Sequence, residues 1–216
     1  MDLPQYSGNK KQIFILSIFT KLVFVFFTIT LIYLFRLGME TYNILDILPK
    51  TNLTFLKAKL ESILVITILI IISWLPGQLI FSVWLLRAHR VSSLLHPVTE
   101  YTPKSTIKLL LGTMIPFVNA YVIQNVLKQI ASNCSYYKKV ISSNMIRSFS
   151  ISIVIAIAIS FLGLLFIALG GGAVPILGLK IILFSIVLWY IVSVFVIYLA
   201  FSVTKTINEV SKETES

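Results

Sequence analysis

A short basic and aromatic motif is the part of this sequence best suited to bind an anion. It directly follows a long apolar run and consists of Trp84, Arg87, His89 and Arg90. Arginine can bind a phosphate through two parallel hydrogen bonds, and tryptophan favours the boundary between membrane and water. The motif therefore predicts a site for a lipid headgroup or another anionic ligand. The alternative is a stop-transfer cluster with an interfacial tryptophan, in which His89 binds no ligand.

A second group of candidates interrupts the apolar runs, and it comprises Pro76, Gln78, Pro116 and Asn119. Proline removes a backbone hydrogen bond, and the freed groups can bind an ion or a polar substrate. The alternative is a kink, or the end of one helix and the start of the next. Lys21 is the charge that lies well inside an apolar run. Buried charges often mark function, but a lysine can also extend its amine to the membrane surface.

Residues for catalysis or metal binding are scarce. The chain has one cysteine, Cys134, and two histidines, His89 and His96, with Glu100 as the acid nearest to them. A nucleophilic site needs a base beside a serine or cysteine, and a structural zinc site needs four ligands. We find no phosphate-binding glycine loop and no paired carboxylates. We therefore expect no enzyme, no cofactor and no metal site.

Four apolar runs must position these residues: 13–35, 63–86, 149–169 and 181–203. Each is about as long as the 20 residues that a helix needs to cross a bilayer. The 216-residue chain is 57% apolar and 12% charged, whereas soluble domains carry about 25% charged residues. The sequence therefore predicts an all-α integral membrane protein with four transmembrane helices. Ile13–Phe35 tolerates Lys21, because its many aliphatic and aromatic residues outweigh one charge.

The last two runs are expected to form an antiparallel hairpin. The short connection between them, residues 170–175, holds three glycines and a proline and carries no charge. Small residues at Ser152, Ala156 and Ser160 are four apart, so they lie on one helix face. Such a face allows a neighbouring helix to approach closely.

The distribution of basic residues predicts the orientation of the chain. We call the stretch between the second and third predicted spans, residues 87–148, the central loop. Twelve Lys and Arg lie in this loop and in residues 1–12 and 204–216, against five on the opposite side of the predicted spans. Lys and Arg are enriched in cytoplasmic loops. We therefore expect a protein of the inner (plasma) membrane with residues 1–12 and 204–216 as cytoplasmic tails. The net charge of +10 has the same origin, and it does not indicate nucleic-acid binding.

The central segment, about residues 105–132, is expected to be interfacial or re-entrant. Ile123, Val126, Leu127 and Ile130 follow helical spacing, and Lys128 lies on the opposite face. An amphipathic helix beside a bilayer lies in the interface with its apolar face toward lipid and its lysine near phosphate. The preceding residues 107–117 are expected to dip into the membrane and pack against the spans. One alternative is a lipid-facing amphipathic helix with no further role. Another is a fifth crossing, which would export one of the two flanking basic clusters.

Several short motifs carry a resemblance to a known family. The matching pieces are Trp84-Leu85-Leu86-Arg87-Ala88-His89-Arg90, Tyr101-Thr102-Pro103, Ile115-Pro116-Phe117-Val118-Asn119-Ala120-Tyr121 and Ile130-Ala131-Ser132. In order and spacing they resemble the bacterial membrane family catalogued as domain of unknown function 4328. The hairpin that ends in Val203-Thr204-Lys205-Thr206-Ile207 also fits, so the resemblance covers the chain from about residue 62 onward.

The resemblance has departures and a limited meaning. The family usually has Ser-Pro-Gly and then tryptophans after the first motif, whereas this chain has Thr102-Pro103-Lys104-Ser105 and then Leu109, Leu110 and Leu111. Aromatic anchoring in that stretch is therefore weaker. The family implies a bacterial multi-span membrane protein and supplies no activity.

Two functions follow from the sequence. The first is a non-enzymatic membrane protein that presents a basic cytoplasmic surface to anionic lipid or to a protein partner. The eight basic residues of the central loop motivate it. The second is a small transporter or channel subunit that acts as a homo-oligomer, because four spans enclose little room for a pathway. It would use Pro76, Pro116, Asn119 and Lys21.

Overall fold

The computed structural model describes residues 4–47, 53–95, 118–133, 142–168 and 174–213, and nearly all of them are helical. Predictions on other residues, including Pro116 and the dip at 107–117, concern segments outside this part of the chain. The helices are α1 (Pro4–Ile47), α2 (Leu53–Leu95), α4 (Val118–Asn133), α6 (Ser143–Ala168) and α7 (Val174–Glu213).

Four of these helices are long and apolar enough to cross a membrane, as the sequence predicts. The shortest, α6, has 26 residues, which at 1.5 Å per residue give about 39 Å against a hydrocarbon thickness of about 30 Å. The predicted runs lie within α1, α2, α6 and α7, except that Leu169 falls just beyond the described end of α6.

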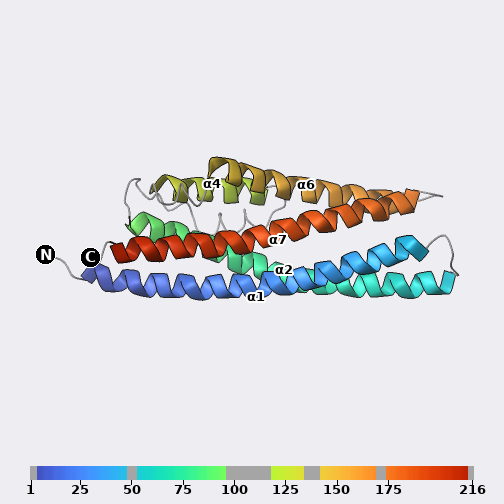
Figure 1. Cartoon of the computed structure of the whole chain (residues 1–216), viewed down its shortest axis with the longest axis horizontal. Coiled ribbons are helices and arrows are strands. Elements are labelled where there is room, and N and C mark those ends of the chain that lie inside the picture. Colours follow the sequence, from blue (N-terminus) through green and yellow to red (C-terminus); the bar gives the residue numbers. More distant parts are fainter. Residues whose placement is uncertain (1–3, 48–52, 96–117, 134–141, 169–173, 214–216) are drawn as a thin grey trace.

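The helices form two antiparallel hairpins, α1 with α2 and α6 with α7. The hairpins meet through α1 and α7, and α2 also touches α7. Helix α4 packs between α2 and α6 at one end of the molecule, and both chain termini lie at that same end (Figure 1). We call this end the terminal half: α4 with residues 4–27, 78–95, 143–157 and 192–213. The loop half holds residues 28–47, 53–77, 158–168 and 174–191.

Glycine allows close approach within both hairpins. A Cβ on Gly163 would lie 2.8 Å from Ile182 Cγ1, and one on Gly77 would lie 3.2 Å from Phe26 Cβ. The expected small-residue face of α6 is present in part: Ala156 is buried, and Ser160 shares a hydrogen bond of 2.5 Å with Ser185 of α7. Ser152 instead donates to a backbone carbonyl of its own helix.

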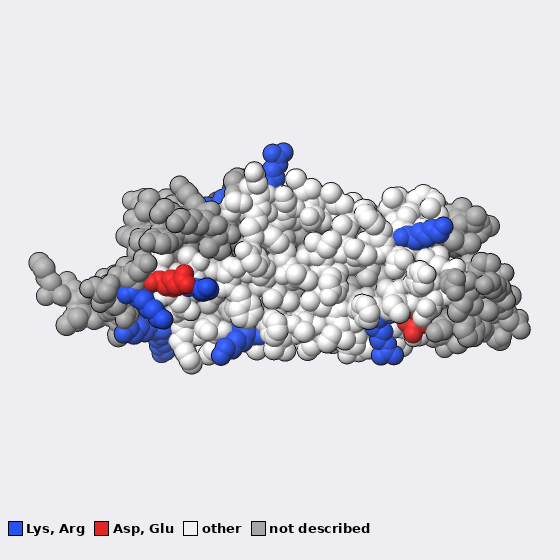
Figure 2. Space-filling view, in the orientation of Figure 1, with Lys and Arg blue, Asp and Glu red and all other residues white. Residues whose placement is uncertain are grey.

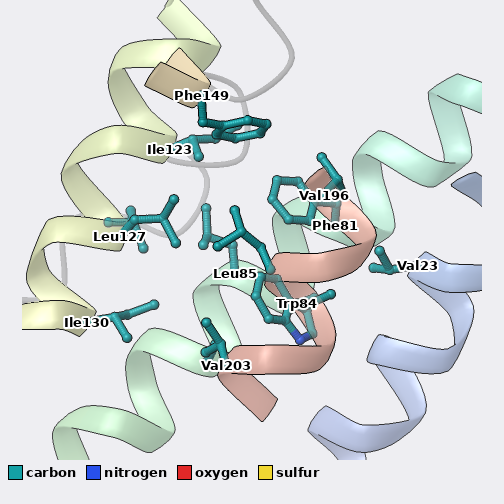
Figure 3. Packing of buried hydrophobic residues seen from close by; sticks show 14 of the residues in the cluster. Val23, Phe81, Trp84, Leu85, Ile123, Leu127, Ile130, Phe149, Val196 and Val203 are labelled. Carbon is teal, nitrogen blue, oxygen red and sulfur yellow. The ribbon is translucent and has the colours of Figure 1, made fainter. Parts of the chain in front are cut away.

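The largest core cluster lies in the terminal half and joins all five helices (Figure 3). Trp84, Leu85, Leu127 and Leu199 are fully buried in it. Aromatic rings fill its centre, with Phe81 stacked on Trp84 at 5.5 Å between centroids. The loop half has a much smaller cluster, formed by Leu34, Leu37, Ile66 and Ile186.

Helix α4 corrects the expectation for the central segment. Its amphipathic pattern is confirmed, because Ile123, Val126, Leu127 and Ile130 are 0–5% exposed while Lys128 is exposed. The expectation that this apolar face is turned toward lipid is wrong: it packs on α2 and α6, and Ser150 of α6 donates to the Ala120 carbonyl at 3.3 Å.

Helix α7 continues beyond the predicted end of the last span. The sequence places a tail at 204–216, and the described residues show helix through Glu213. Thr204, Ile207 and Val210 are buried along this extension. The residues that follow the apolar run therefore belong to the packed bundle.

Candidate functional site

Trp84 does not lie where the sequence places it. Its side chain is 0% exposed, so it cannot contact a lipid headgroup as expected for the basic motif. The indole Nε1 donates to Thr20 Oγ1 at 3.0 Å and to Thr204 Oγ1 at 3.2 Å. The two threonine hydroxyls are themselves 2.8 Å apart. Trp84 is thus a core residue that ties α2 to α1 and α7, and we remove it from the candidate site.

The other members of the motif lie nearer the surface. Arg90 is exposed, and Arg87 is half-buried with its guanidinium carbon 5.1 Å from the centroid of the Phe19 ring. His89 is half-buried and hydrogen-bonded to the side chain of Gln129 in α4. The motif therefore has a structural part, which links α2 to α1 and α4, and a charged part that can meet an anion.

Charged residues are unevenly divided between the two halves. In the described chain the terminal half carries Lys10, Lys11, Lys21, Arg87, Arg90, Lys128, Arg147, Lys205 and Lys212. Glu209 is the acid among the side chains described there, and Glu213 ends α7. On the face drawn in Figure 2 most charges lie toward the two ends; the broad stretch between them is uncharged apart from one basic side chain that projects from the upper edge near mid-length. That stretch is suited to a hydrocarbon environment.

A polar pocket of about 390 Å³ lies on the terminal half between α1 and α7. Helix α1 supplies Ser17, Thr20 and Lys21. The lining from α7 consists of Phe201, Thr204, Lys205, Asn208, Glu209 and Lys212. Lys205 Nζ lies 3.8 Å from Glu209 Oε1. The pocket has more positive than negative groups and can hold an anion.

Lys21 belongs to this pocket. The sequence allows two roles for this residue: a buried functional charge, or a lysine that extends its amine to the membrane surface. The structure shows an exposed side chain that shares the pocket with Lys205, Lys212 and Glu209. No carboxylate occurs in the predicted spans, but α7 brings Glu209 to the same pocket from beyond its span.

The sequence contains a pattern that indicates this pocket, although the sequence analysis does not predict it. Ser17, Thr20 and Lys21 share a helix face with Phe24 through the i, i+3, i+4, i+7 spacing. The α7 residues from Phe201 to Lys212 repeat the pattern on their helix. Polar side chains on one face at the end of an apolar helix indicate a polar contact there. What the sequence does not give is that the two faces meet.

An apolar groove of about 570 Å³ lies between the two hairpins, mainly in the loop half. Its walls come from α1, α2, α6 and α7, and Ile123 of α4 reaches its inner end. Exposed residues of α2 and α6, among them Ile71 and Phe161, form its rim. The described lining holds hydroxyls, one amide and two indoles, and no charged group. The groove suits an apolar occupant.

The predicted helix breaks lie in different places. Pro76 is inside α2, which continues through it to Leu95. Gln78 is buried and lines the groove. Asn119 is in the first turn of α4, where the structure describes its backbone, and Pro116 lies outside the described residues. Because Pro116 and the Asn119 side chain lie outside the described part of the chain, a site that joins them with Pro76 and Gln78 stays a prediction.

Within the described ranges no three His, Cys, Asp or Glu side chains come together as a metal site requires. Comparison with known proteins gives no relative: no family, no curated protein and no solved structure matches the chain. The resemblance to domain of unknown function 4328 accordingly stays a prediction.

Proposed function

We propose that this chain is a multi-pass membrane protein without catalytic activity that holds anionic lipid headgroups at its terminal half, on the cytoplasmic side. The observation that supports it is the gathering of Lys and Arg from all five helices, with Glu209 as the acidic side chain described beside them. Four helices that are long and apolar enough to cross a membrane support the part of the proposal that surrounds the bundle with lipid. Lysine and arginine near a membrane surface each attract anionic lipid by about 1 kcal/mol.

The attraction should depend on salt. Arg90 and Lys128 are exposed, and Arg87 keeps its guanidinium against the Phe19 ring. Exposed charges interact over a Debye length, which is about 10 Å at 0.1 M salt and about 3 Å at 1 M. Enrichment of anionic lipid around the protein should therefore fall as salt rises.

The test compares two sets of charge-neutralising variants in nanodiscs of mixed phosphatidylglycerol and phosphatidylcholine. The measurement is the fraction of phosphatidylglycerol that remains with the protein after detergent stripping. We expect enrichment in the unchanged protein, and its loss in R87Q/R90Q/K128Q. The control, R36Q/K180Q, changes exposed charges of the loop half and should keep the enrichment. Equal enrichment in the triple variant would reject the proposal.

The orientation is tested separately. With both termini and the central loop in the cytoplasm, Cys134 should resist a membrane-impermeant maleimide in intact cells. It should react after the membrane is opened. Reaction in intact cells would reverse the orientation. An acidic protein partner would use the same basic surface, and crosslinking from the Arg87–Lys139 region in native membranes would identify it.

The groove favours a second candidate, a small transporter or channel subunit that acts as an oligomer. Its uncharged lining favours an apolar solute over an ion. Replacing Gln78, which lines the groove, by leucine should then change the flux of an apolar dye in liposomes. Ion flux that depends on Asn119 or Lys21 would support the channel form that the sequence suggests.

A further inference from the structure

We propose that the pocket between α1 and α7 is a specific phosphate site, which binds the phosphate of an anionic lipid with Lys21, Lys205 and Lys212. This inference rests on the proposed function and deepens it, because it replaces a diffuse attraction by one defined site. The pocket of about 390 Å³ is within the range of roughly 300–1,000 Å³ typical of small-molecule sites.

The two helix faces meet in a regular antiparallel register. Thr20 Oγ1 and Thr204 Oγ1 share a hydrogen bond of 2.8 Å at the inner end of the pocket. Towards the membrane, the rings of Phe24 and Phe201 meet edge to face at 5.7 Å. Towards the chain ends, Ser17 and the residues from Lys205 to Lys212 complete the lining. The lining thus has Phe201 at its membrane end, Lys21 and Lys205 next to the threonine pair, and Ser17, Asn208, Glu209 and Lys212 toward the chain ends.

The inner end of the pocket is held rigidly. Trp84 Nε1 donates to both threonine hydroxyls, and Thr20 Oγ1 lies 3.0 Å from the Leu16 carbonyl that it can donate to. These hydroxyls are occupied by protein partners, so they set the shape of the pocket and leave the anion to other groups. A site whose walls are fixed in advance loses less entropy when a ligand binds.

The charges of the pocket lack a matching number of acids. Lys205 lies beside Glu209, and the described lining adds Lys21 and Lys212 without a second acid. Like charges that share a pocket repel one another, and a bound anion removes that repulsion. Phosphate offers several acceptor oxygens for lysine amines, and Asn208 and Ser17 add neutral donors.

The aromatic edge points to a lipid as the source of the phosphate. Phe24 and Phe201 are 44% and 46% exposed, which suits contact with acyl chains. Lys21 is ten residues along α1 from Lys11, or about 15 Å towards the membrane centre at 1.5 Å per residue. The pocket therefore lies at the boundary between headgroups and hydrocarbon, where a lysine can extend its amine toward phosphate.

The experiment measures binding of short-chain phosphatidic acid to the full chain in an uncharged detergent, by native mass spectrometry. The variant is K21Q/K212Q and the matched control is K10Q/K11Q, which removes the same charge from α1 outside the pocket. Loss of two charge-assisted hydrogen bonds predicts at least a roughly tenfold weaker affinity in K21Q/K212Q. The control should lose clearly less affinity than K21Q/K212Q, because Lys10 and Lys11 lie outside the pocket and attract the lipid only at longer range.

A second variant tests the role of the acid. Replacing Glu209 by glutamine removes the carboxylate that competes with phosphate for Lys205. We expect binding to tighten by roughly two- to fivefold. A purely structural role for the pocket predicts no gain. Phosphatidylcholine should bind no better to the unchanged protein than to K21Q/K212Q, because its headgroup is neutral overall.

The outcomes separate this inference from the proposed function. Equal phosphatidic acid binding in K21Q/K212Q and the unchanged protein overturns the site. Equal loss in K10Q/K11Q also overturns it, in favour of diffuse attraction, and nanodisc enrichment that depends on Arg87, Arg90 and Lys128 then leaves the proposed function standing. Lysine-dependent binding of inorganic phosphate alone, without phosphatidic acid, overturns the lipid source.

Discussion

The terminal half and the loop half are built from the same apolar helices, yet they pack differently. In the terminal half, α4 fills the space between α2 and α6, and Trp84, Leu127 and Leu199 are fully buried there. In the loop half that space is a groove of about 570 Å³. Length and hydropathy make a helix suitable for the membrane. Whether the four long helices also form a continuous core depends on α4, which packs between the hairpins in the terminal half only.

The largest expected difference between the halves is the loss of a tryptophan. Trp84→Ala removes a fully buried ring, and such changes cost about 3–5 kcal/mol of unfolding free energy. Trp74→Ala in the loop half should cost clearly less, because its ring is half-buried beside the groove and meets Trp189 edge to face at 6.0 Å. Denaturant titration in mixed micelles measures both.

Trp84→Phe is the control for this pair, since it keeps a ring and removes the indole donor. It should cost about 1 kcal/mol, well below the alanine variant. A larger loss for Trp74→Ala than for Trp84→Ala would contradict the view that the terminal half carries most of the stability.

Two glycines of the loop half, Gly163 and Gly38, test where its helices are tightly packed and where they are not. A Cβ on Gly163 would lie 2.8 Å from Ile182 Cγ1, whereas one on Gly38 would lie 3.7 Å from Ile186 Cγ2. Gly163→Ala should therefore destabilise by about 1–3 kcal/mol, as overpacking does. Gly38→Ala meets ordinary contact distances and should be neutral or stabilise by up to about 1 kcal/mol, since alanine favours helix.

Thermal unfolding of the two alanine variants in one detergent separates them. A larger loss of thermal stability in Gly163→Ala than in Gly38→Ala would show that the loop-half helices are tightly packed within each hairpin and less tightly packed between the hairpins. Equal tolerance at both glycines would mean that α6 and α7 can move apart at little cost, and the groove would then extend into the hairpin itself.

The four long helices could be predicted from the sequence because a run of about 20 apolar residues is by itself typical of a helix that can cross a membrane. The amphipathic face of α4 could be predicted as well, from Ile123, Val126, Leu127 and Ile130. Its partner could not, because lipid and an apolar protein surface select the same residues. An amphipathic pattern indicates that one face of the helix is shielded from water. It does not indicate whether lipid or another helix shields that face.

Trp84 shows the same limit for a candidate site. A tryptophan beside arginines is typical of a membrane interface, and the sequence gives no sign that Thr20 and Thr204, far away in the chain, accept its indole N–H. The pocket between α1 and α7 depends on the same pairing of distant helices. The chemistry of Lys21 and Glu209 is visible in the sequence, and their common pocket is not.

A third prediction compares the polar contacts of the two halves. Thr20→Val or Thr204→Val alone leaves Trp84 Nε1 one acceptor and should cost about 0.5–1.5 kcal/mol. Each single variant already breaks the Thr20–Thr204 hydrogen bond, which by itself would make the double loss smaller than the sum of the single losses. The double variant also leaves a buried donor unpaired, which costs about 1–3 kcal/mol. We expect this second effect to dominate, so that the double loss exceeds the sum. The Thr30–Ser73 hydrogen bond, at 3.1 Å in the loop half, should show a coupling near the average of about 0.6 kcal/mol in membranes.

Double-mutant cycles of unfolding free energy measure both couplings. A double loss at Thr20 and Thr204 that stays below the sum of the single losses, as expected for Thr30 and Ser73, would remove the special role of Trp84 in joining three helices. The valine side chain keeps the shape of threonine, so the cycle reports the hydrogen bonds and not a cavity.

The smallest expected effect concerns the charges on the surface of the terminal half. Lys205 and Glu209 are 78% and 60% exposed, and exposed pairs at this spacing contribute about 0.3–0.5 kcal/mol. Lys205→Gln should therefore leave the unfolding free energy within about 0.5 kcal/mol of the unchanged protein, while it weakens phosphatidic acid binding. Chemical denaturation and native mass spectrometry on one preparation test both statements. A loss of stability as large as that of the threonine variants would mean that the pair helps to hold α7 in place. The stability of the terminal half would then depend on its charges as well as on its core.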